Sequence, residues 1–433
     1  MPSPELSRRH LLGAGLAAVA AAALPGGAQA ASPLGGWEPA VAGPQVFSNA
    51  TLVRHTGVKV QGGIVVEGGD IVAMGPEVKG GLDLGGAWLC PGFTDAGCTV
   101  GLYEIDQEEA THDDDEGSSA FTPDARAWEG YNPLSAVVPI ARSQGVAAVL
   151  VHPSMNRLLV GQAGLLRTVG RTVDEALLRA PVGMALNFGR AGISGQGDSP
   201  KSRMGVAMEL RKRMAAIELP PAKGERPRKG EEVKPDKEVS PADQALRDWK
   251  RGKIGSLLRA ERADDILMAI DFARSHKLRA ALVGCAEGHL VAREIAESGY
   301  GVLLGGLMVQ PDNFETLHAR YDNAALLHEA GVKLAFRSGA NHTSRNLRVD
   351  AGVTVAHGLP WEVAIRALTA GIGDVLGVPG RYGRLAVGAP ATFFVSDGDP
   401  LQARSRVTQM WIDGRPVSLR NRQTELFERY RTL

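Results

Sequence analysis

Three groups of polar residues have the chemistry of a metal site or a catalytic site. The run His112–Glu116 places hard carboxylates beside an imidazole, and Mg²⁺ and Ca²⁺ prefer such oxygen ligands. Cys285, Glu287 and His289 are close enough in sequence to share one side of a Cys/His/Glu metal site. Cys98 and Cys285 are also potential nucleophiles, and each would need a neighbouring base.

Each group also has a simpler interpretation. The acidic run is typical of a solvated loop near a site. His152, His289 and His342 are single histidines near predicted strand ends or loops, and a lone histidine is more often a hydrogen-bonded structural residue than a ligand. The pair Asp264-Asp265 is placed to cap the helix that is predicted from Ile266 onward.

A scaffold that brings distant strand ends together is predicted after Pro91-Gly92. Apolar, β-branched runs alternate with helical stretches over nearly 300 residues, which indicates an α/β fold with a parallel sheet, most economically a (β/α)8 TIM-type barrel. A doubly wound sheet is less favoured because its usual Gly-x-Gly-x-x-Gly turn is missing. We expect strands at 146–151, 279–283, 301–304 and 332–336, and helices at 132–143, 264–275, 290–298, 322–330 and 361–369.

The two ends of the chain flank this predicted barrel with short β-rich runs. Residues 45–90 and 385–420 contain turn signals such as Gly68-Gly69 and Asp413-Gly414. They predict one small β-sandwich domain built from both chain ends. The barrel then spans 91–384, and residues 220–243, rich in Lys, Glu, Pro and Gly, are expected to form a charged mobile excursion from it.

The N-terminus has the features of an export signal. Arg8-Arg9 precedes an apolar run from Leu11 to Leu24, and Ala28-Gln29-Ala30 is a small-x-small cleavage site. The twin arginine indicates the pathway for folded cargo. We therefore expect a signal peptide at 1–30, a linker at 31–44 and a periplasmic or secreted protein. No membrane attachment is expected after cleavage, because the apolar run is too short to span a bilayer.

The overall composition favours no highly charged partner. The 433 residues include 48 basic and 48 acidic side chains, so nothing favours nucleic acid or an anionic membrane. The three cysteines, Cys90, Cys98 and Cys285, have no paired spacing and do not predict a disulfide framework.

Several segments resemble the amidohydrolase superfamily. Residues 86–96, GAWLCPGFTDA, resemble its strand-one motif PGFIDxHxH. Residues 383–401 (GRLAVGAPATFFVSDGDPL) and 410–414 (MWIDG) look like its closing stretch, and 132–162 look like the imidazolonepropionase-like subgroup. The resemblance covers roughly residues 45–420 and is specific at both ends.

The resemblance implies a metal site at the C-terminal mouth of the barrel. There, imidazoles and carboxylates hold one or two divalent ions that activate water, and an aspartate on the last strand moves the proton. This chain departs from that pattern at every position compared. The positions of the His-x-His, the mid-barrel imidazoles, the next histidine and the catalytic aspartate carry Gly97 and Thr99, Arg259 and Glu261, Gly284, and Gly339.

These departures predict an exported protein that has lost metal-dependent hydrolysis. It would act as a pseudoenzyme or as the partner subunit of an active homologue, with no metal and no other cofactor. The alternative is an active hydrolase of cyclic amide or other non-peptide C–N bonds that holds Zn²⁺ or another divalent ion on displaced ligands. A third hypothesis is a small molecule bound at the mouth, with Arg259 and Arg337 holding an anion. The candidate ligand-binding residues are Arg259, Arg262, Arg337, Glu287 and His289.

Overall fold

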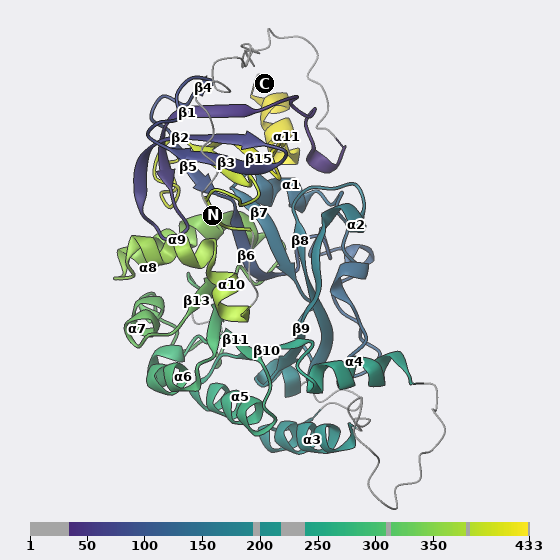
Figure 1. Cartoon of the computed structure of the whole chain (residues 1–433). Helices are drawn as coiled ribbons and strands as arrows, with labels where there is room; N and C mark the ends of the chain where they lie inside the picture. Colours follow the sequence, from purple (N-terminus) through teal and green to yellow (C-terminus); the bar gives the residue numbers. More distant parts are fainter. Residues whose placement is uncertain (1–33, 194–199, 218–238, 309–312, 378–381, 432–433) are drawn as a thin grey trace, which may run out of the picture.

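The computed structural model describes residues 34–193, 200–217, 239–308, 313–377 and 382–431. The predicted signal peptide lies outside these ranges, as do most of the predicted charged excursion and the first residues of the predicted linker. Within them the chain forms two sheets, each of eight strands, with helices packed mainly around one of them (Figure 1).

The smaller sheet joins the two ends of the chain. Its strand order is β16-β15-β14-β5-β1-β2-β3, with β4 paired to β1, and the antiparallel pair β5–β14 links the N-terminal strands to the C-terminal ones. Its strands are β1 (Gln45–Val53), β2 (Lys59–Glu67), β3 (Asp70–Gly75), β4 (Leu82–Asp83), β5 (Trp88–Pro91), β14 (Phe393–Ser396), β15 (Val407–Ile412) and β16 (Arg415–Pro416). A small β domain built from both ends is confirmed. All its described strands belong to one hydrogen-bonded sheet, and its division into two packed layers stays a prediction.

Aromatic residues from both ends hold this sheet together. Phe47 of β1 packs edge-on against Phe393 of β14 and Trp411 of β15, with ring centroids 5.2 and 4.7 Å apart. Phe393 and Trp411 stack on each other at 5.0 Å. Since such rings bury large apolar areas in a fixed geometry, they join strands that are more than 340 residues apart in sequence. Asp413 and Gly414 form the predicted hairpin turn, both with positive φ.

The larger sheet is the barrel, and it is nearly closed. Its order is β13-β12-β11-β10-β9-β8-β7-β6. The strands are β6 (Phe93–Cys98), β7 (Val146–Val151), β8 (Leu159–Arg167), β9 (Leu177–Asn187), β10 (Gly255–Ala260), β11 (Ala280–Gly284), β12 (Gly301–Leu304) and β13 (Leu334–Phe336). The first and last strands are joined beyond their ends, where the Gly339 N–H donates to the Gly97 carbonyl at 3.0 Å.

One strand departs from the regular (β/α)8 pattern that we predicted. β8 runs antiparallel to both β7 and β9, so β7–β8–β9 is a meander in place of a strand–helix–strand unit. The physical reason is the short connection: residues 152–158 join β7 to β8, too few for the helical crossover that a parallel pair needs. The other neighbouring barrel strands pair in parallel, as predicted.

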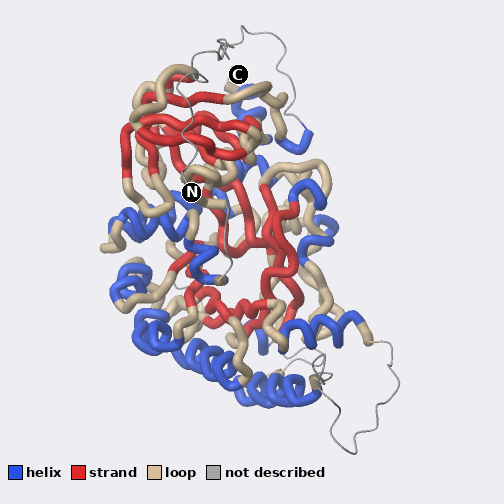
Figure 2. The backbone as a smooth tube through the Cα atoms, in the orientation of Figure 1, coloured by secondary structure: helices blue, strands red, loops and turns tan. Residues whose placement is uncertain are grey.

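Helices cover the outside of the barrel unevenly. In Figure 1, α3, α5, α6 and α7 form an arc along one side, whereas the long strands β8 and β9 lie on the opposite side. The tube in Figure 2 shows the same arc of helices, with loops and short helical turns on the side of the meander. The helices are α1 (Val137–Arg142), α2 (Val173–Ala176), α3 (Arg203–Ala216), α4 (Pro241–Lys250), α5 (Ala263–Ser275), α6 (Ala292–Ser298), α7 (Asn323–Glu329), α8 (Leu347–Ala356), α9 (Trp361–Leu368), α10 (Gly371–Leu376) and α11 (Arg422–Tyr430). None of the helices in the described ranges has the length and apolar character needed to cross a membrane.

Alternation along the barrel strands separates an inner core from an outer core. Leu257 of β10 packs in the barrel interior with Ala335 of β13 and Leu150 of β7, whereas Leu258 faces the outer layer of helices. Successive side chains of a strand point to opposite faces. The residues that follow the inward ones by two positions, Arg259 and Arg337 among them, are therefore directed into the mouth above this apolar plug.

Candidate ligand site at the barrel mouth

The mouth of the barrel contains a small cavity of about 210 Å³. It is formed where β6, β7, β10 and β13 end, at the C-terminal edge of the parallel strands, which is where barrels of this kind build their sites. Its lining residues are Thr99, Tyr103, His152, Ser154, Met155, Asn156, Ala191, Arg259, Arg337, Gly339 and Ala340. Two of the five predicted ligand-binding candidates, Arg259 and Arg337, meet there.

Arg337 is the central residue of this cavity. Its side chain is buried, with 7% of the residue exposed, and its Nη2 lies 3.3 Å from His152 Nε2. Its Nε is buried and has no hydrogen-bond partner among the residues that the structure describes. Burial, and then the charge of Arg259, lowers the pKa of Arg337, although an arginine remains protonated at neutral pH.

Glycines surround the Arg337 side chain. A Cβ built on Gly97 would lie 2.9 Å from Arg337 Nε, and one built on Gly305 would lie 3.2 Å from its Nη1. A Cβ on Gly339 would lie 3.5 Å from both terminal nitrogens. Three strand ends thus leave the space that the guanidinium fills, and larger side chains at Gly97 would have to displace it.

Glu261 occupies a similar glycine cradle. A Cβ on Gly284 would lie 2.4 Å from Glu261 Oε1, and Gly284 has a φ of +92°, where an L side chain would be strained. The Glu261 carboxylate accepts from the Ala286 N–H at 3.2 Å and pairs with Arg259 Nε at 3.3 Å. Arg259 and Glu261 therefore form an ion pair at the rim of the mouth, in which each charge is balanced by the other.

His152 is a site residue whose role the sequence did not reveal. Its Nδ1 lies 2.8 Å from the carbonyl oxygen of the next residue, Pro153. Because a carbonyl oxygen only accepts, Nδ1 must carry the proton of this hydrogen bond. Nε2 is then the unprotonated acceptor for Arg337. The alternation of side chains along β7 could have predicted this position. Leu150 points into the barrel, so His152, two residues later, points into the mouth.

The stability of the protein is expected to fall between pH 6.5 and 3 because of His152. Burial, and then the charge of Arg337, lowers the pKa of His152 from 6.5 to about 3. In this window the unfolded chain binds a proton that the folded protein excludes. The free energy of unfolding therefore falls by up to about 1.4 kcal/mol per pH unit as the pH is lowered. Urea unfolding of the wild type and of His152→Gln at pH 7, 6, 5 and 4 measures this slope.

In the variant His152→Gln, the free energy of unfolding should depend less steeply on pH than in the wild type. The difference in slope should correspond to at most one proton, which is about 1.4 kcal/mol per pH unit. His342→Gln, which changes an exposed histidine, is the matched control for the loss of an imidazole. Equal slopes for the wild type and His152→Gln would contradict the assignment of a buried neutral imidazole.

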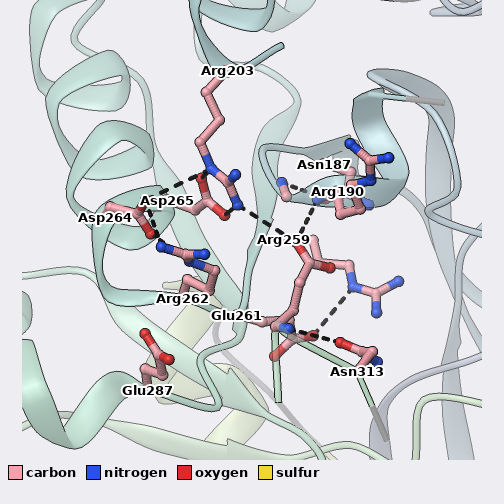
Figure 3. A network of polar contacts seen from close by, with 12 residues as sticks. Asn187, Arg190, Arg203, Arg259, Glu261, Arg262, Asp264, Asp265, Glu287 and Asn313 are labelled. Atoms are coloured by element: carbon pink, nitrogen blue, oxygen red, sulfur yellow. Dashed lines mark hydrogen bonds and ion pairs between the residues drawn. The ribbon is translucent and has the colours of Figure 1, made fainter. Parts of the chain in front are cut away.

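Three other candidates do not line the mouth cavity. Arg262 is the residue before α5 and pairs with Asp264 at 2.9 Å, and Figure 3 shows its guanidinium directed away from that of Arg259. Glu287 accepts from the Ala263 N–H at 2.9 Å and from His318 at 2.7 Å. His289 follows in the turn before α6. These residues lie past the strand ends, where the two-residue alternation no longer applies, and the structure places them outside the lining of the cavity that Arg259 and Arg337 share.

The predicted cap of α5 is also corrected by these contacts. Asp264 and Asp265 lie in the first turn of α5, but neither is its N-cap residue, because the helix begins at Ala263 and Arg262 takes that position. The Ala263 N–H is bound by Glu287. The buried Asp265 instead pairs with Arg203 of α3, with Nε–Oδ1 at 2.5 Å and Nη2–Oδ2 at 2.8 Å (Figure 3). This ion pair ties α3 to α5 beside the mouth.

The acidic run after the first barrel strand is spread over separate contacts. Asp114 binds the Ser154 hydroxyl and lies 3.5 Å from His112 Nδ1, whereas Asp115 pairs with Arg157 at 2.9 Å. These bonds hold the loop after β6 against the loop after β7. In the described part of the chain, no group of three or more His, Cys, Asp or Glu side chains could hold a metal ion.

The cysteines are all buried and unpaired. Burial raises the pKa of the Cys98 and Cys285 thiols well above the ordinary value. Cys98 packs with Val100 and Leu102 outside the barrel interior. Since the thiolate is the reactive form, neither residue is poised as a nucleophile.

The metal that the resemblance implies does not fit these residues. Gly97, Gly284 and Gly339 offer no ligand atoms, and the side chains of Arg337 and Glu261 fill the space beside them. A guanidinium cannot coordinate a cation, because it has donors and no acceptor. What the arrangement can do is hold negative charge or support a fold.

The chain is similar in sequence to a protein named as an amidohydrolase, whereas no family model matches the chain. Amidohydrolase tasK of Hapsidospora irregularis is 24% identical over 361 residues. The match covers 77% of this chain and 36% of that protein, so the chain spans about a third of its relative's length.

Solved structures extend this similarity to the fold. The crystal structure of an amidohydrolase from Thermotoga maritima MSB8 matches with a TM-score of 0.79 and 26% identity, over 87% of this chain and 100% of that chain. A prolidase complexed with N-methylphosphonate-L-proline matches with a TM-score of 0.55 and 18% identity, over 87% and 99% of the two chains. A 5-methylcytosine deaminase from Klebsiella pneumoniae matches with a TM-score of 0.55 and 12% identity, over 87% and 98%. The last two show a shared fold alone.

Proposed function

The chain belongs to the amidohydrolase superfamily, and from that premise we propose that it does not carry out metal-dependent hydrolysis. It acts instead as a binding module, or as the partner subunit of an active homologue, built on the intact barrel. One observation carries this proposal: the Arg337 guanidinium lies against Gly97 and Gly339, two of the positions where the resemblance implies metal-site residues.

The charge of Arg337 strengthens the argument. A divalent cation at those strand ends would lie beside a buried, permanently charged guanidinium, and the repulsion between like charges in a poorly solvated site is large. Gly97, Gly284 and Gly339 contribute no compensating carboxylate or imidazole. The mouth is therefore arranged for negative charge rather than for a cation.

Export completes the proposal. The sequence of residues 1–30 favours the twin-arginine pathway, which carries folded proteins and allows an assembled partner to travel with a signal-bearing subunit. The protein would then act in the periplasm or outside the cell.

Metal analysis of the exported protein is the direct test. The full chain is expressed with its signal in medium supplemented with Zn²⁺ and Mn²⁺, purified from the periplasmic fraction without chelators, and analysed by inductively coupled plasma mass spectrometry. We expect clearly less than one equivalent of metal per chain, and no metal-dependent cleavage of cyclic amides or N-acyl amino acids.

Other outcomes separate the alternatives. About one equivalent of Zn²⁺ that survives dialysis and supports hydrolysis would establish the displaced-ligand enzyme instead. Retention of the protein in the cytoplasm would contradict export. A second amidohydrolase-like chain that co-purifies in fixed stoichiometry would favour the partner-subunit role over a binding module that acts alone.

A further inference from the structure

The cavity at the barrel mouth holds a buried cation without a counter-charge at ion-pair distance. Arg337 is 7% exposed, and in the described ranges no carboxylate oxygen lies within 4.0 Å of its guanidinium nitrogens. Asp95 and Glu261 favour its charged form from farther away. Burial of an unpaired charge is costly, so such groups usually mark a function.

Most of the donors on Arg337 have no acceptor within the described part of the chain. Of its five N–H bonds, the structure gives an acceptor to one, at His152 Nε2. Its Nε is buried without a partner in the described ranges, and the side chain lines the cavity. A guanidinium presents pairs of parallel N–H bonds that match the two oxygens of a carboxylate.

His152 orients the guanidinium without neutralising it. The imidazole accepts from Nη2 while its Nδ1 donates to the Pro153 carbonyl, so the ring is neutral. It thereby fixes one edge of Arg337 and leaves the positive charge intact. In this respect His152 is a positioning residue for whatever binds Arg337.

Arg259 adds a second guanidinium to the lining of the cavity. Arg259 lines the same space, with 33% of its side chain exposed, and its charge is already balanced by Glu261 at 3.3 Å. Met155, Ala191 and Ala340 provide apolar surface between the polar groups. The site thus offers one uncompensated positive charge, one further donor and a small apolar wall.

We propose that the mouth cavity binds a small organic carboxylate whose carboxyl group pairs with Arg337. This goes beyond the loss of hydrolysis, because it names a ligand class for the remodelled site. One uncompensated guanidinium matches the single charge of a carboxylate better than the nearly double charge of inorganic phosphate at neutral pH. The volume of about 210 Å³ is below the ~300 Å³ at which typical drug-sized sites begin, so the ligand is small.

Isothermal titration calorimetry on the mature protein at low ionic strength tests the proposal. The probes are acetate, butyrate, succinate and inorganic phosphate. We expect saturable binding of at least one carboxylate at millimolar concentration or below, and a loss of about tenfold or more in Arg337→Met. Arg262→Met is the matched control, since Arg262 follows the same strand as Arg259 but pairs with Asp264 outside the cavity, and it should bind like the wild type.

Each remaining outcome decides against the proposal. Absence of binding for every carboxylate up to 20 mM would overturn it, as would binding that Arg337→Met leaves unchanged in a folded variant checked by circular dichroism. Phosphate bound more tightly than all carboxylates would overturn the ligand class. Metal content is measured on the same sample: metal-free protein that binds no probe loses only this inference, whereas binding that EDTA abolishes would contradict the proposed function itself.

Discussion

Substitution of Asp95 by Ala is expected to destabilise the folded protein by about 3 to 6 kcal/mol. The Asp95 carboxylate is fully buried and accepts from the Ser338 N–H at 3.0 Å, the Ser338 hydroxyl at 2.5 Å and the Gly97 N–H at 3.2 Å. Alanine would leave the two backbone N–H groups without their acceptor, whereas the Ser338 hydroxyl keeps a second one, the Ala340 carbonyl at 3.2 Å. Each unsatisfied buried donor costs roughly 1 to 3 kcal/mol, and the bond from the hydroxyl is lost as well. Urea denaturation at pH 7, followed by circular dichroism, measures the change.

The position of Asp95 explains the size of this effect. It lies on β6, the first barrel strand, and binds the residue that follows β13 by two positions. β6 and β13 share no ladder of hydrogen bonds, so Asp95 and the neighbouring Gly339–Gly97 bond close the barrel. Asp95→Asn keeps one acceptor and should lie between the wild type and Asp95→Ala.

A matched surface variant separates this role from a general effect of removing a carboxylate. Asp124 is exposed, and Asp124→Ala should change the free energy of unfolding by no more than about 0.5 kcal/mol. A cost below about 1 kcal/mol for Asp95→Ala would mean that the barrel does not depend on this carboxylate for closure.

Arg337→Met is expected to have the opposite effect and to stabilise the ligand-free protein by about 1 to 4 kcal/mol. The substitution removes a buried charge and a buried Nε without a partner, and methionine fills a similar, adaptable volume. The measurement is the urea midpoint at constant slope, in buffer free of carboxylates. Stabilisation combined with lost binding would identify Arg337 as a residue retained for function rather than for folding.

Arg142 provides the contrasting buried arginine. It is 3% exposed, but its Nε donates to the Ser418 carbonyl at 2.8 Å and its Nη1 to the Thr168 carbonyl at 2.5 Å. Arg142→Met should therefore destabilise the protein by about 2 kcal/mol or more, because it leaves two carbonyls unsatisfied. If both arginine variants were destabilised alike, Arg337 would be a structural residue.

The regular part of the fold could be predicted because its signals are local. The runs 146–151 and 301–304 are strands with the predicted bounds, and the helices expected at 264–275 and 361–369 differ from the observed ones by one residue. The meander of β8 and β9 was missed. Its residues include Gly161, Gly164 and Gly183, which blur the alternation of apolar residues, and an antiparallel excursion within a parallel barrel depends on tertiary pairing.

The site was predictable only where strand alternation reaches it. Arg259 and Arg337 share the inward face of β10 and β13, so their meeting in the mouth follows from the barrel itself. The cradles at Gly305 and Gly284 could not be foreseen, because the close approach of a side chain to a glycine is a contact in space. The same is true of the tautomer of His152, which a backbone carbonyl determines.

The antiparallel meander also bears on the order in which the chain folds. Two short segments, residues 152–158 and 168–176, connect β7, β8 and β9. These three strands of the barrel can therefore pair through local contacts with little loss of chain entropy. Asp95 and Ser338, by contrast, are 243 residues apart, and their bond closes the longest loop of the barrel. The mouth is thus completed by a contact between residues far apart in sequence, the kind that forms slowly. Binding of a ligand at the mouth would therefore distinguish fully folded molecules from chains in which the sheet has formed but the barrel has not yet closed.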